Sequence, residues 1–459
     1  MAVPAPLPWP VESRLPGVAW PAVPAPAAAQ LFALLFQLER TQWLAPEDLR
    51  ALQLRQLEQL IRHAAGTVPY YRERLSGKWS AVQPLTWEAF GSFPLLGRTD
   101  LQTNGASMAS ETPVAQHGPV TDARTSGSTG MPVRVLRTAV DGLFWNAFTL
   151  RDHAWHCRDL AGKLCAIRQG VTEAHGDNWG AATRGVIRTG TASTFPVSRD
   201  VAAQMKWLEE QQPDYLLSHP TNVGALARRS IEQGMRLPRL REVRTSGEAL
   251  DPEVRGLCRE AWGVPVIDMY SANEVGYIAL QCPGTEHYHV MAEGLLVEVL
   301  DDAGRACRPG ETGRVVVTTL HNFAMPLVRY VIGDYAEVGV PCPCGRGLPV
   351  LTRVLGRVRN MLVLANGGRF WPAFGLRGLV EELRILQHQI VQKTTDLIEA
   401  RLAVAAPLDA GQEERLRNQL LSRLPSGFQV RFVYCDGIPR NVGGKYEDFL
   451  SEVTASPGP

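Results

Sequence analysis

Apolar positions along this chain repeat with two different periods. Between residues 160 and 300, short apolar runs alternate with longer segments that place an apolar residue at every third or fourth position. The short runs KLCAIRQ, DYLLSH, EVRTSG and PVIDMYS predict strands, and VAAQMKWLEEQ, NVGALARRSIEQG and PEVRGLCREAW predict helices between them. Regular alternation of strand and helix is typical of an α/β fold with a largely parallel sheet.

The flanking segments add helices before this core and a β-rich piece after it. One or two helices are predicted for LRALQLRQLEQLIRHAAGTVPYYRERL. A short helix and a second helix that starts at Thr99 or Asp100 are predicted for LTWEAFGSFPLLGRTDLQTN. A further helix is predicted for TAVDGLFWNAFTLRDHAWHC. GLLVEVLDDAGRACRPGETGRVVVTTL has the pattern of a strand, an Asp/Gly turn and a strand. Near the end, EERLRNQLLSRL predicts a helix, and ARLAVAA and QVRFVYC predict strands.

We therefore predict an α/β protein with two domains. A large multi-layer N-terminal domain, with parallel sheets and the smaller β-rich piece, would span residues 31–356, and a small α+β C-terminal domain would span 357–459. The glycine-rich GRVRNMLVLANGGRFWP marks the boundary. Residues 1–30 are rich in Ala and Pro and lack the features of a secretory signal, which predicts a disordered or extended tail.

Composition narrows the function classes. The 45% hydrophobic and 20% charged residues are ordinary for a globular protein, and the net charge of +1 without a basic block argues against a nucleic-acid partner. No apolar run reaches the ~18–20 residues that span a bilayer, so no membrane association is expected. Most of the eight cysteines are isolated in apolar surroundings, which suits the reduced thiols of a cytoplasmic protein.

Chemistry is first suggested by the stretch RTSGSTGMPVRV at 124–135. A loop this rich in Gly, Ser and Thr is either a plain surface loop or one whose backbone N–H groups wrap an anion, most often phosphate. It is not a P-loop, since Met131 follows Gly130 where that motif has lysine. It does stand between an apparent strand and a helix that opens near Val140, where free N–H groups can meet an anion.

Four later stretches carry further polar groups on glycine-bearing turns. They are RTSGEAL at 244–250, DMYSANEVG at 268–276, VRYVIGDYAEV at 328–338 and IPRNVGGKYEDF at 438–449. Taken singly, each has a plain reading. Asp334 would cap a turn, Glu274 would favour a helix dipole, and Lys445 would be one more solvated lysine.

Taken together and in order, these motifs resemble the adenylate-forming superfamily, and within it the phenylacetate–CoA ligase/CapK-like branch. HAAGTVPYYRERL, RTSGSTG, TSGEAL, YSANEVG, PLVRYVIGDYAEV, CPCGR, GR at 356–357 and the terminal GGK all occur in that branch's order, from about residue 50 to 450. The resemblance implies an ATP- and Mg²⁺-dependent ligase. It would convert a small carboxylic acid to acyl-AMP and then pass the acyl group to a thiol, with coenzyme A as the first candidate.

The resemblance also implies roles for individual residues. The triphosphate would lie in the loop of Thr125, Ser126, Gly127, Ser128, Thr129 and Gly130, and the adenine against Gly247, Glu248 and Ala249. Tyr270 would stack on the purine beside Ser271, Asp334 would bind the ribose hydroxyls, and Arg357 would join the ribose or phosphate region. Glu274 would ligate Mg²⁺, and Lys445 would stabilise the charge of the forming acyl phosphate.

Several features depart from the branch or leave alternatives open. Met131 lacks the polar group that many relatives carry, and Asn360 replaces an acidic residue near the expected hinge of a rotating C-terminal domain. The acid pocket is expected near 166–180, which does not resemble aryl-CoA ligases. The acceptor could instead be a carrier-protein thiol or an amine, and a non-catalytic scaffold that kept the fold is a further alternative. The branch favours an aromatic or heteroaromatic acid.

A second site is suggested by QCPGTEHYH at 281–289 and PCPCGR at 341–346. Cys282, His289, Cys342 and Cys344 would complete a Cys₃His tetrahedron, which suits a structural Zn²⁺, and some members of the branch bind zinc at matching cysteines. His287 is an alternative ligand. We prefer His289 because it matches the branch's strand start. The alternative without metal is two reduced thiols in a tight turn.

Overall fold

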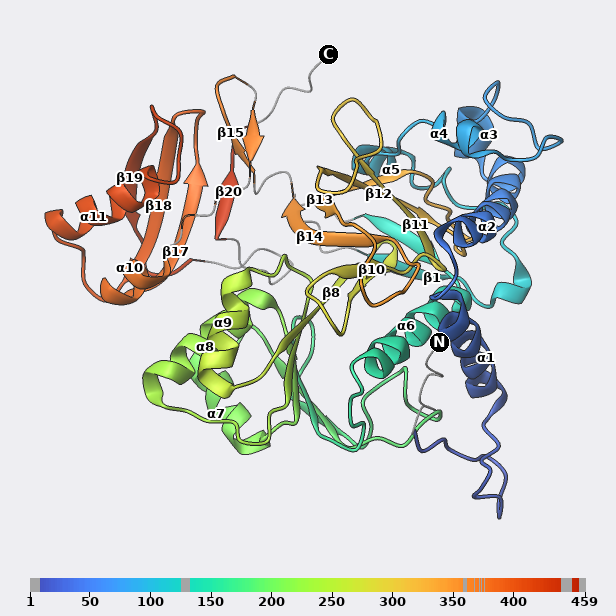
Figure 1. Cartoon of the computed structure of the whole chain (residues 1–459), viewed down its shortest axis with the longest axis horizontal. Helices are drawn as coiled ribbons and strands as arrows, with labels where there is room; N and C mark the ends of the chain where they lie inside the picture. Colours follow the sequence, from blue (N-terminus) through green and yellow to red (C-terminus); the bar gives the residue numbers. More distant parts are fainter. Residues whose placement is uncertain are drawn as a thin grey trace. The chain divides into compact units, whose positions relative to one another are not determined.

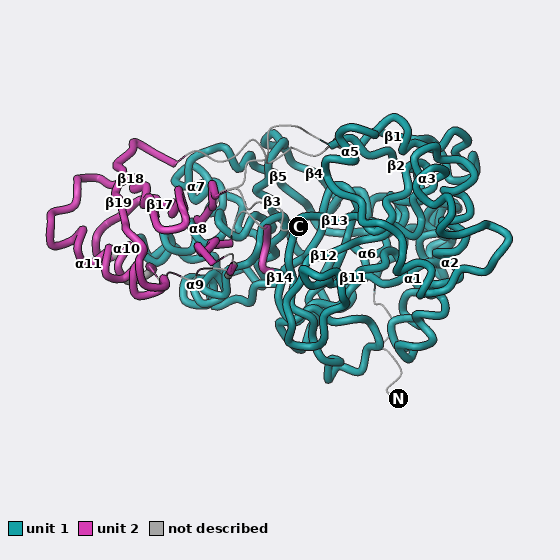
Figure 2. The backbone as a smooth tube through the Cα atoms, turned by 90° about the horizontal axis from the view of Figure 1, so that it is seen from above, with its two compact units in different colours: residues 1–354 teal, residues 355–459 magenta. Residues whose placement is uncertain are grey.

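The computed structural model describes residues 9–124, 133–357, 361–366, 368–370, 372, 374, 376–438 and 448–453. The chain divides into two compact units, Met1–Val354 and Leu355–Pro459 (Figure 2). This division falls two residues before the boundary expected from the sequence. Each unit has its own apolar core.

Helices open the first unit. They are α1 (Pro26–Thr41), α2 (Pro46–Thr67), α3 (Pro69–Arg74), α4 (Trp87–Gly91), α5 (Arg98–Asn104) and the short 3₁₀ helix η1 (Ala115–His117). The helix α1 begins inside the expected tail, because Pro26 at its first turn has a preset φ and the alanines that follow favour a helix. In α2, Leu49, Leu57 and Leu60 lie at helical spacing and are buried on one face.

A sheet of twelve strands forms the centre of this unit (Figure 1). Its strands are β3 (Leu164–Arg168), β4 (Ala174–Gly176), β5 (Ala192–Pro196), β6 (Tyr215–Ser218), β7 (Glu242–Ser246), β8 (Val266–Ala272), β9 (Gly276–Gln281), β10 (Tyr288–Val290), β11 (Leu295–Leu300), β12 (Thr312–Thr319), β13 (Tyr330–Val338) and β14 (Val350–Arg357). They lie in the order β11-β12-β13-β14-β10-β9-β8-β7-β6-β3-β5-β4.

One half of this sheet is parallel, as the alternating pattern predicts. The strands β5, β3, β6, β7 and β8 pair in parallel, and the helices α7 (Val201–Gln211), α8 (Pro220–Gln233) and α9 (Pro252–Trp262) connect them. Buried Trp207, Leu226 and Leu257 on these helices share a core with Leu216 and Val243 of the strands. The predicted α/β fold class is therefore confirmed, and the predicted helices and strands of this region occur within a few residues of their expected bounds.

The other half of the sheet is antiparallel. The hairpin predicted at 294–320 is formed by β11 and β12, which pair from Leu295 with Thr319 to Leu300 with Arg314. It continues the same sheet through β13 and β14 instead of standing apart. As a result, β13 and β14 lie between β12 and β10 in the sheet, so β14 pairs with β10, which precedes it by about 60 residues in the chain.

The glycine-rich segment 125–132 lies outside the described residues, but both of its flanks are described. Strands β1 (Thr121–Arg124) and β2 (Arg134–Arg137) form an antiparallel hairpin around it, with Arg124 opposite Arg134. The helix α6 (Ala139–Trp155) follows directly. The predicted strand and helix therefore flank the loop, with an additional short strand before the helix.

The second unit is small and mixed. Its elements are β15 (Leu362–Val363), β16 (Arg369–Phe370), α10 (Arg377–Glu382), β17 (Ile385–Gln392), β18 (Leu397–Val404), α11 (Ala410–Leu421), β19 (Gln429–Tyr434) and β20 (Phe449–Ser451). Four strands form a sheet in the order β19-β18-β17-β20, and Leu416 and Leu420 of α11 belong to its core. Within the described ranges, no helix of either unit is long and apolar enough to cross a membrane.

Candidate functional site

Predicted site residues gather where the parallel strands β7 and β8 end. Ser246 at the end of β7 lies opposite Met269 of β8, so the turn that begins at Gly247 and the residues Tyr270 and Ser271 lie at the same edge. Gly247 has a φ of +87°, a conformation that side chains with a Cβ rarely adopt. Ligands of open α/β sheets bind outside the carboxyl ends of their strands, which is this edge.

Tyr270 and Asp334 meet at this edge although 64 residues separate them. The Tyr270 hydroxyl donates a hydrogen bond of 2.8 Å to Oδ2 of Asp334. The sequence suggested that Asp334 lies in a turn, but it lies within β13, one residue after Gly333 with its φ of +91°. The simple turn-capping interpretation of Asp334 is therefore wrong.

Glu248 has a partner that explains its position. Its Oε2 accepts hydrogen bonds from the backbone N–H of Thr221, at 3.1 Å, and from the Thr221 hydroxyl, at 2.8 Å. Thr221 belongs to the first turn of α8, where unpaired backbone N–H groups favour a carboxylate. The Glu248 carboxylate thus joins the turn after β7 to the start of α8, while neighbouring Ala249 is exposed.

Glu274 lies between β8 and β9 and is only 5% exposed. Its Oε1 is 3.6 Å from Nη1 of Arg98, the first residue of α5. The alternative that Glu274 stabilises a helix start is wrong, because a turn into the antiparallel strand β9 follows it. Among the described residues Glu274 forms one ion pair, and a nearly buried carboxylate of this kind is suited to hold a hard cation such as Mg²⁺.

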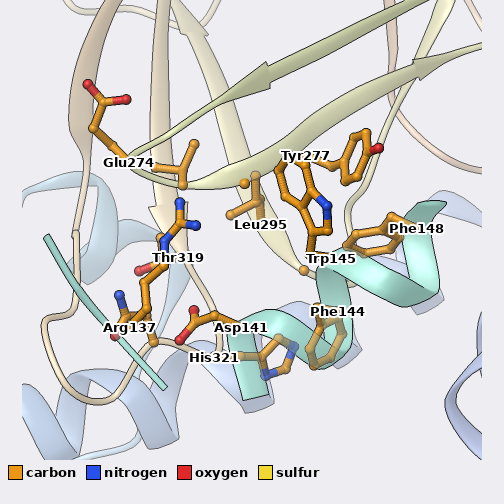
Figure 3. Close-up of a pocket in the computed structure, with 14 residues that line it drawn as sticks. Arg137, Asp141, Phe144, Trp145, Phe148, Glu274, Tyr277, Leu295, Thr319 and His321 are labelled. Carbon is orange, nitrogen blue, oxygen red and sulfur yellow. The ribbon is translucent and has the colours of Figure 1, made fainter. Parts of the chain in front are cut away.

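A small pocket, with a cavity volume of about 40 Å³, opens beside Glu274 (Figure 3). Aromatic side chains line one side, with Trp145 and Tyr277 at 4.3 Å between ring centroids and Phe148 next to them. Arg137 and Glu274 lie on the opposite side. A pocket with one charged and one aromatic side can hold a small molecule that is itself both charged and apolar.

Gly294 helps to keep this pocket open. A Cβ atom at Gly294 would lie 2.8 Å from Cε2 of Phe148, so any larger residue would displace this ring. At the polar edge, His321 stacks on Phe144 with 4.1 Å between ring centroids, and its Nε2 is 2.9 Å from the carbonyl oxygen of Glu293. Burial lowers the pKa of His321, which keeps its imidazole neutral near pH 7.

This pocket lies elsewhere than the sequence suggested. The stretch 166–180 was expected to form the acid pocket, but none of it lines this cavity. It runs from β3 to β4, and β4 is the outermost strand at the opposite end of the sheet order from β11. Sequence reasoning missed Arg137, Trp145, Tyr277 and His321. Only Trp145 had a local signal, because it lies on the aromatic-rich helix α6 that follows the glycine-rich loop and β2.

Eight of the predicted site residues are not among those that line the pocket. The six loop residues 125–130 and Lys445 lie outside the described residues. Arg357 ends β14 and belongs to the second unit. Their assignments to the triphosphate, the acyl phosphate and the ribose or phosphate region remain predictions.

The four predicted zinc ligands do come together. Sγ of Cys282, Cys342 and Cys344 and a ring nitrogen of His289 all lie within 4.8 Å of one another. The two sulfurs of Cys282 and Cys342 are 3.7 Å apart, and Sγ of Cys344 is 3.3 Å from Nε2 of His289. Two thiolates on a tetrahedral zinc would be about 3.8 Å apart, given Zn–S bonds of about 2.3 Å. The donor set and its spacing therefore fit zinc.

The alternative ligand His287 is not part of this group. His289 is fully buried in β10, whereas His287 lies in the turn before that strand and only its backbone carbonyl bonds to Cys282. Cys282 follows β9, and Cys342 and Cys344 lie in the loop before β14, both neighbours of β10 in the sheet. The group thus joins three strands of the sheet.

Comparison with known proteins identifies the family of this chain. The model of the AMP-binding enzyme family matches residues 69–325. The chain is 26% identical to a phenylacetate–coenzyme A ligase of Thermus thermophilus over 91% of this chain and 99% of that protein. It is 25% identical to one of Pseudomonas putida, over 86% and 93%.

Solved structures share the fold. A 2-hydroxyisobutyryl-CoA ligase in its postadenylation state is similar with a TM-score of 0.70 and 20% identity, covering 90% of this chain and 92% of that one. An anthranilate CoA ligase with anthranoyl-AMP reaches a TM-score of 0.53 at 16% identity, over 71% and 65%. These similarities confirm the resemblance that the motifs indicated.

Proposed function

Because the chain belongs to the AMP-binding enzyme family, we propose that it activates a carboxylic acid with ATP and transfers the acyl group to a thiol, that of coenzyme A. The observation that carries this proposal is the meeting of Tyr270 and Asp334 at the carboxyl edge of the sheet, with Glu274 and the pocket in the same unit. The similarity to phenylacetate–coenzyme A ligases supports the choice of reaction.

In the first half-reaction the ionised carboxylate attacks the α-phosphorus of ATP. One P–O bond forms, the bond to the β-phosphate oxygen breaks, and pyrophosphate leaves, without any proton transfer. The protein supplies position and charge stabilisation. Tyr270 would face the purine, Asp334 the ribose and Glu274 the magnesium ion, while the loop 125–130 would bind the triphosphate and Lys445 the crowded α-phosphate.

In the second half-reaction a thiolate displaces AMP from the acyl group. We propose that the second unit rotates between the two steps about residues 356–360, so that Lys445 acts only in the first. A carrier-protein thiol or an amine remains an alternative acceptor. Coenzyme A is preferred because the curated relatives that match over most of this chain are coenzyme A ligases.

We also propose that Cys282, His289, Cys342 and Cys344 hold one zinc ion. Four protein ligands would complete its coordination, so the ion would stabilise the fold and take no part in the reaction. Support comes from the convergence of all four donor atoms. Three of the four residues that carry them are buried.

The decisive experiment is ATP–pyrophosphate exchange over aryl, heteroaryl, amino and fatty acids, followed by product analysis with coenzyme A, a carrier protein and amines. We expect exchange with at least one acid and a thioester as product. Lys445→Ala should reduce adenylation at least about 100-fold and leave ATP binding within about twofold of the wild type. Lys393→Ala is the control, since Lys393 is a half-buried lysine paired with Glu452, and it should leave exchange unchanged.

Absence of exchange with every acid, together with a co-purifying partner protein, would replace the enzyme proposal by the scaffold alternative. A Lys445→Ala variant with the wild-type rate would remove the role of this lysine alone.

A further inference from the structure

An arginine lies directly beside the group formed by Cys282, His289, Cys342 and Cys344. Arg346 follows Cys344 by two residues in the loop before β14, and its backbone N–H and its side chain both donate hydrogen bonds to Sγ of Cys344. Its other side-chain contacts are to one glutamine and two tryptophans, and no carboxylate forms an ion pair with it in the described part of the chain. Its positive charge therefore faces the sulfur atoms and no acidic residue.

The guanidinium of Arg346 is held in place by several neighbours. Its Cζ lies 4.8 Å from the ring centroid of Trp43 and 4.4 Å from that of Trp155. Its Nε donates a hydrogen bond of 2.9 Å to Oε1 of Gln42, which also accepts one of 2.8 Å from the indole N–H of Trp155. Gln42 is fully buried, and its carbonyl oxygen accepts a hydrogen bond of 2.9 Å from Gly347. A cation with this many partners stays where it is, so its charge is fixed next to Cys344.

A second arginine near the group is already neutralised. Arg151 and Arg346 both lie close enough to His289 to act on its charge. However, Nη1 and Nη2 of Arg151 donate to the two carboxylate oxygens of Glu293, at 3.0 and 2.7 Å. The charge of Arg151 is thus balanced within its own pair, and that of Arg346 is not.

The proposed zinc ligands would carry a net charge that needs such a partner. Three thiolates and one neutral imidazole around a divalent ion leave one negative charge on the whole group. Cys282 and His289 are at most 1% exposed, and Cys342 is 5% exposed. Burying a charge is costly unless an opposite charge or hydrogen-bond donors compensate it.

We propose that Arg346 is the counter-charge of the metal group and determines how tightly the group binds zinc, although it does not touch the ion. This inference rests on the zinc site put forward under the proposed function, and goes beyond it by assigning affinity to a residue outside the four ligands. A residue that supports a metal ligand in this way typically accounts for about 10- to 100-fold in metal affinity.

The contacts of Arg346 also determine which elements the metal group would stabilise. Gln42 and Trp43 lie between α1 and α2, and Trp155 is the last residue of α6. The ring of His289 meets that of Trp155 edge-on, with 5.6 Å between centroids. The metal group, Arg346 and the ends of three helices therefore form one packed cluster.

The test compares Arg346→Gln, which removes the charge, with Arg346→Lys, which keeps the charge but loses the planar guanidinium. Zinc affinity of the full-length protein is measured by competition with a chromogenic chelator after the purified protein has been stripped of metal. Arg346→Gln should weaken zinc binding about 10- to 100-fold, and Arg346→Lys should lie between this variant and the wild type. Arg353→Gln, which removes an exposed arginine paired with Glu337 on β14, is the control and should stay within about twofold of the wild type.

A double-mutant cycle separates the charge of Arg346 from its packing. Cys344→Ser removes one thiolate, so the remaining ligands and the ion form a neutral group. In this background Arg346→Gln should weaken binding of zinc and of Co²⁺ by no more than about threefold, whereas loss of packing alone would weaken it equally in both backgrounds. The visible spectrum of Co²⁺-loaded Arg346→Gln at saturating metal should keep the thiolate bands of the wild type, because all four ligands remain.

The outcomes are distinct. A folded Arg346→Gln protein with wild-type zinc affinity, or equal losses in the two backgrounds, would overturn the inference and leave the zinc site in place. A wild-type protein that binds neither zinc nor Co²⁺ would overturn both. ATP–pyrophosphate exchange is measured separately, so its absence would end the proposed reaction without touching this inference. If Arg346→Gln does not fold, Arg346→Lys decides through the same cycle.

Discussion

Asp334 illustrates how much of this site depends on one side chain. It lies in β13, accepts a hydrogen bond from Tyr270 of β8, and so links the two strands that bring the predicted nucleotide contacts together. A carboxylate at this place can accept from both hydroxyls of a ribose, which a neutral side chain of similar size does less well.

We expect Asp334→Ala to weaken nucleotide binding about 10- to 100-fold, because two charge-assisted hydrogen bonds to the ribose would be lost. Isothermal titration calorimetry with ATP and AMP measures this loss. Glu337→Ala is the control, since Glu337 lies on the same strand but pairs with Arg353. An affinity equal to that of the wild type would contradict the ribose assignment.

Among the elements, the short strand β10 links the predicted metal group to the strands β7 and β8, which carry the predicted nucleotide contacts. It carries His289 at the metal group, and next to it Tyr288 donates a hydrogen bond of 2.7 Å to Oδ2 of buried Asp268 in β8. Oδ1 of Asp268 accepts a hydrogen bond of 2.6 Å from Thr245 in β7. The metal group is therefore joined through β10 to β8, the strand that carries Tyr270.

Metal analysis of the purified protein should find about one zinc per chain. Cys342→Ser should lose most of it and lower the thermal midpoint, because structural zinc contributes directly to folding free energy. Cys157→Ser removes an exposed cysteine outside the group and should keep both the zinc and the midpoint. A stable wild-type protein free of metal would show these cysteines to be ordinary thiols.

At the scale of the whole molecule, a buried ionic network joins α6 to the parallel sheet. Oδ2 of Asp152 accepts from Arg158 and Arg244 at 2.6 and 2.7 Å, and Arg158 also pairs with Glu242 at 2.7 Å. His156 lies beside it, with Nε2 3.6 Å from Oδ1 of Asp152. Burial is the largest influence on His156, and it lowers the pKa to about 4 although Asp152 attracts a proton.

This pKa predicts how stability depends on pH. Unfolded His156 binds a proton near its usual pKa of about 6.5, whereas the folded form binds it only near 4, so folding releases a proton between these values. The free energy of unfolding should therefore be highest above pH ~6.5 and fall toward pH 4, by up to about 3 kcal/mol from this residue.

Urea unfolding between pH 7.5 and 4.5 measures this slope. Tryptophan fluorescence reports mainly on the first unit, because Trp371 is the only tryptophan after residue 354. His156→Gln keeps a donor near the Gln281 carbonyl oxygen, which is 3.2 Å from Nε2, and should flatten the slope. A variant with the wild-type slope would assign the pH dependence to other groups.

Local patterns in the chain were sufficient for the order of helices and strands, since amphipathic periodicity depends on neighbouring residues. They also selected Tyr270, Glu274, Asp334 and the four metal-group residues as candidates, because these stand in short motifs whose order is typical of the superfamily. Motifs on the ends of parallel strands meet at one edge of a sheet, so the spatial meeting of Tyr270 and Gly247 was within reach of sequence reasoning.

Only the three-dimensional packing decided the remainder. The placement of Asp334 inside a strand, the joining of the late hairpin to the main sheet and the location of the pocket all depend on contacts between residues far apart in the chain. Arg137 and Trp145 could not be assigned to a pocket in advance, because their partners Asn273 and Tyr277 lie more than a hundred residues downstream. No local periodicity encodes such pairs, since they form only when the sheet brings β2, α6 and the turn after β8 together.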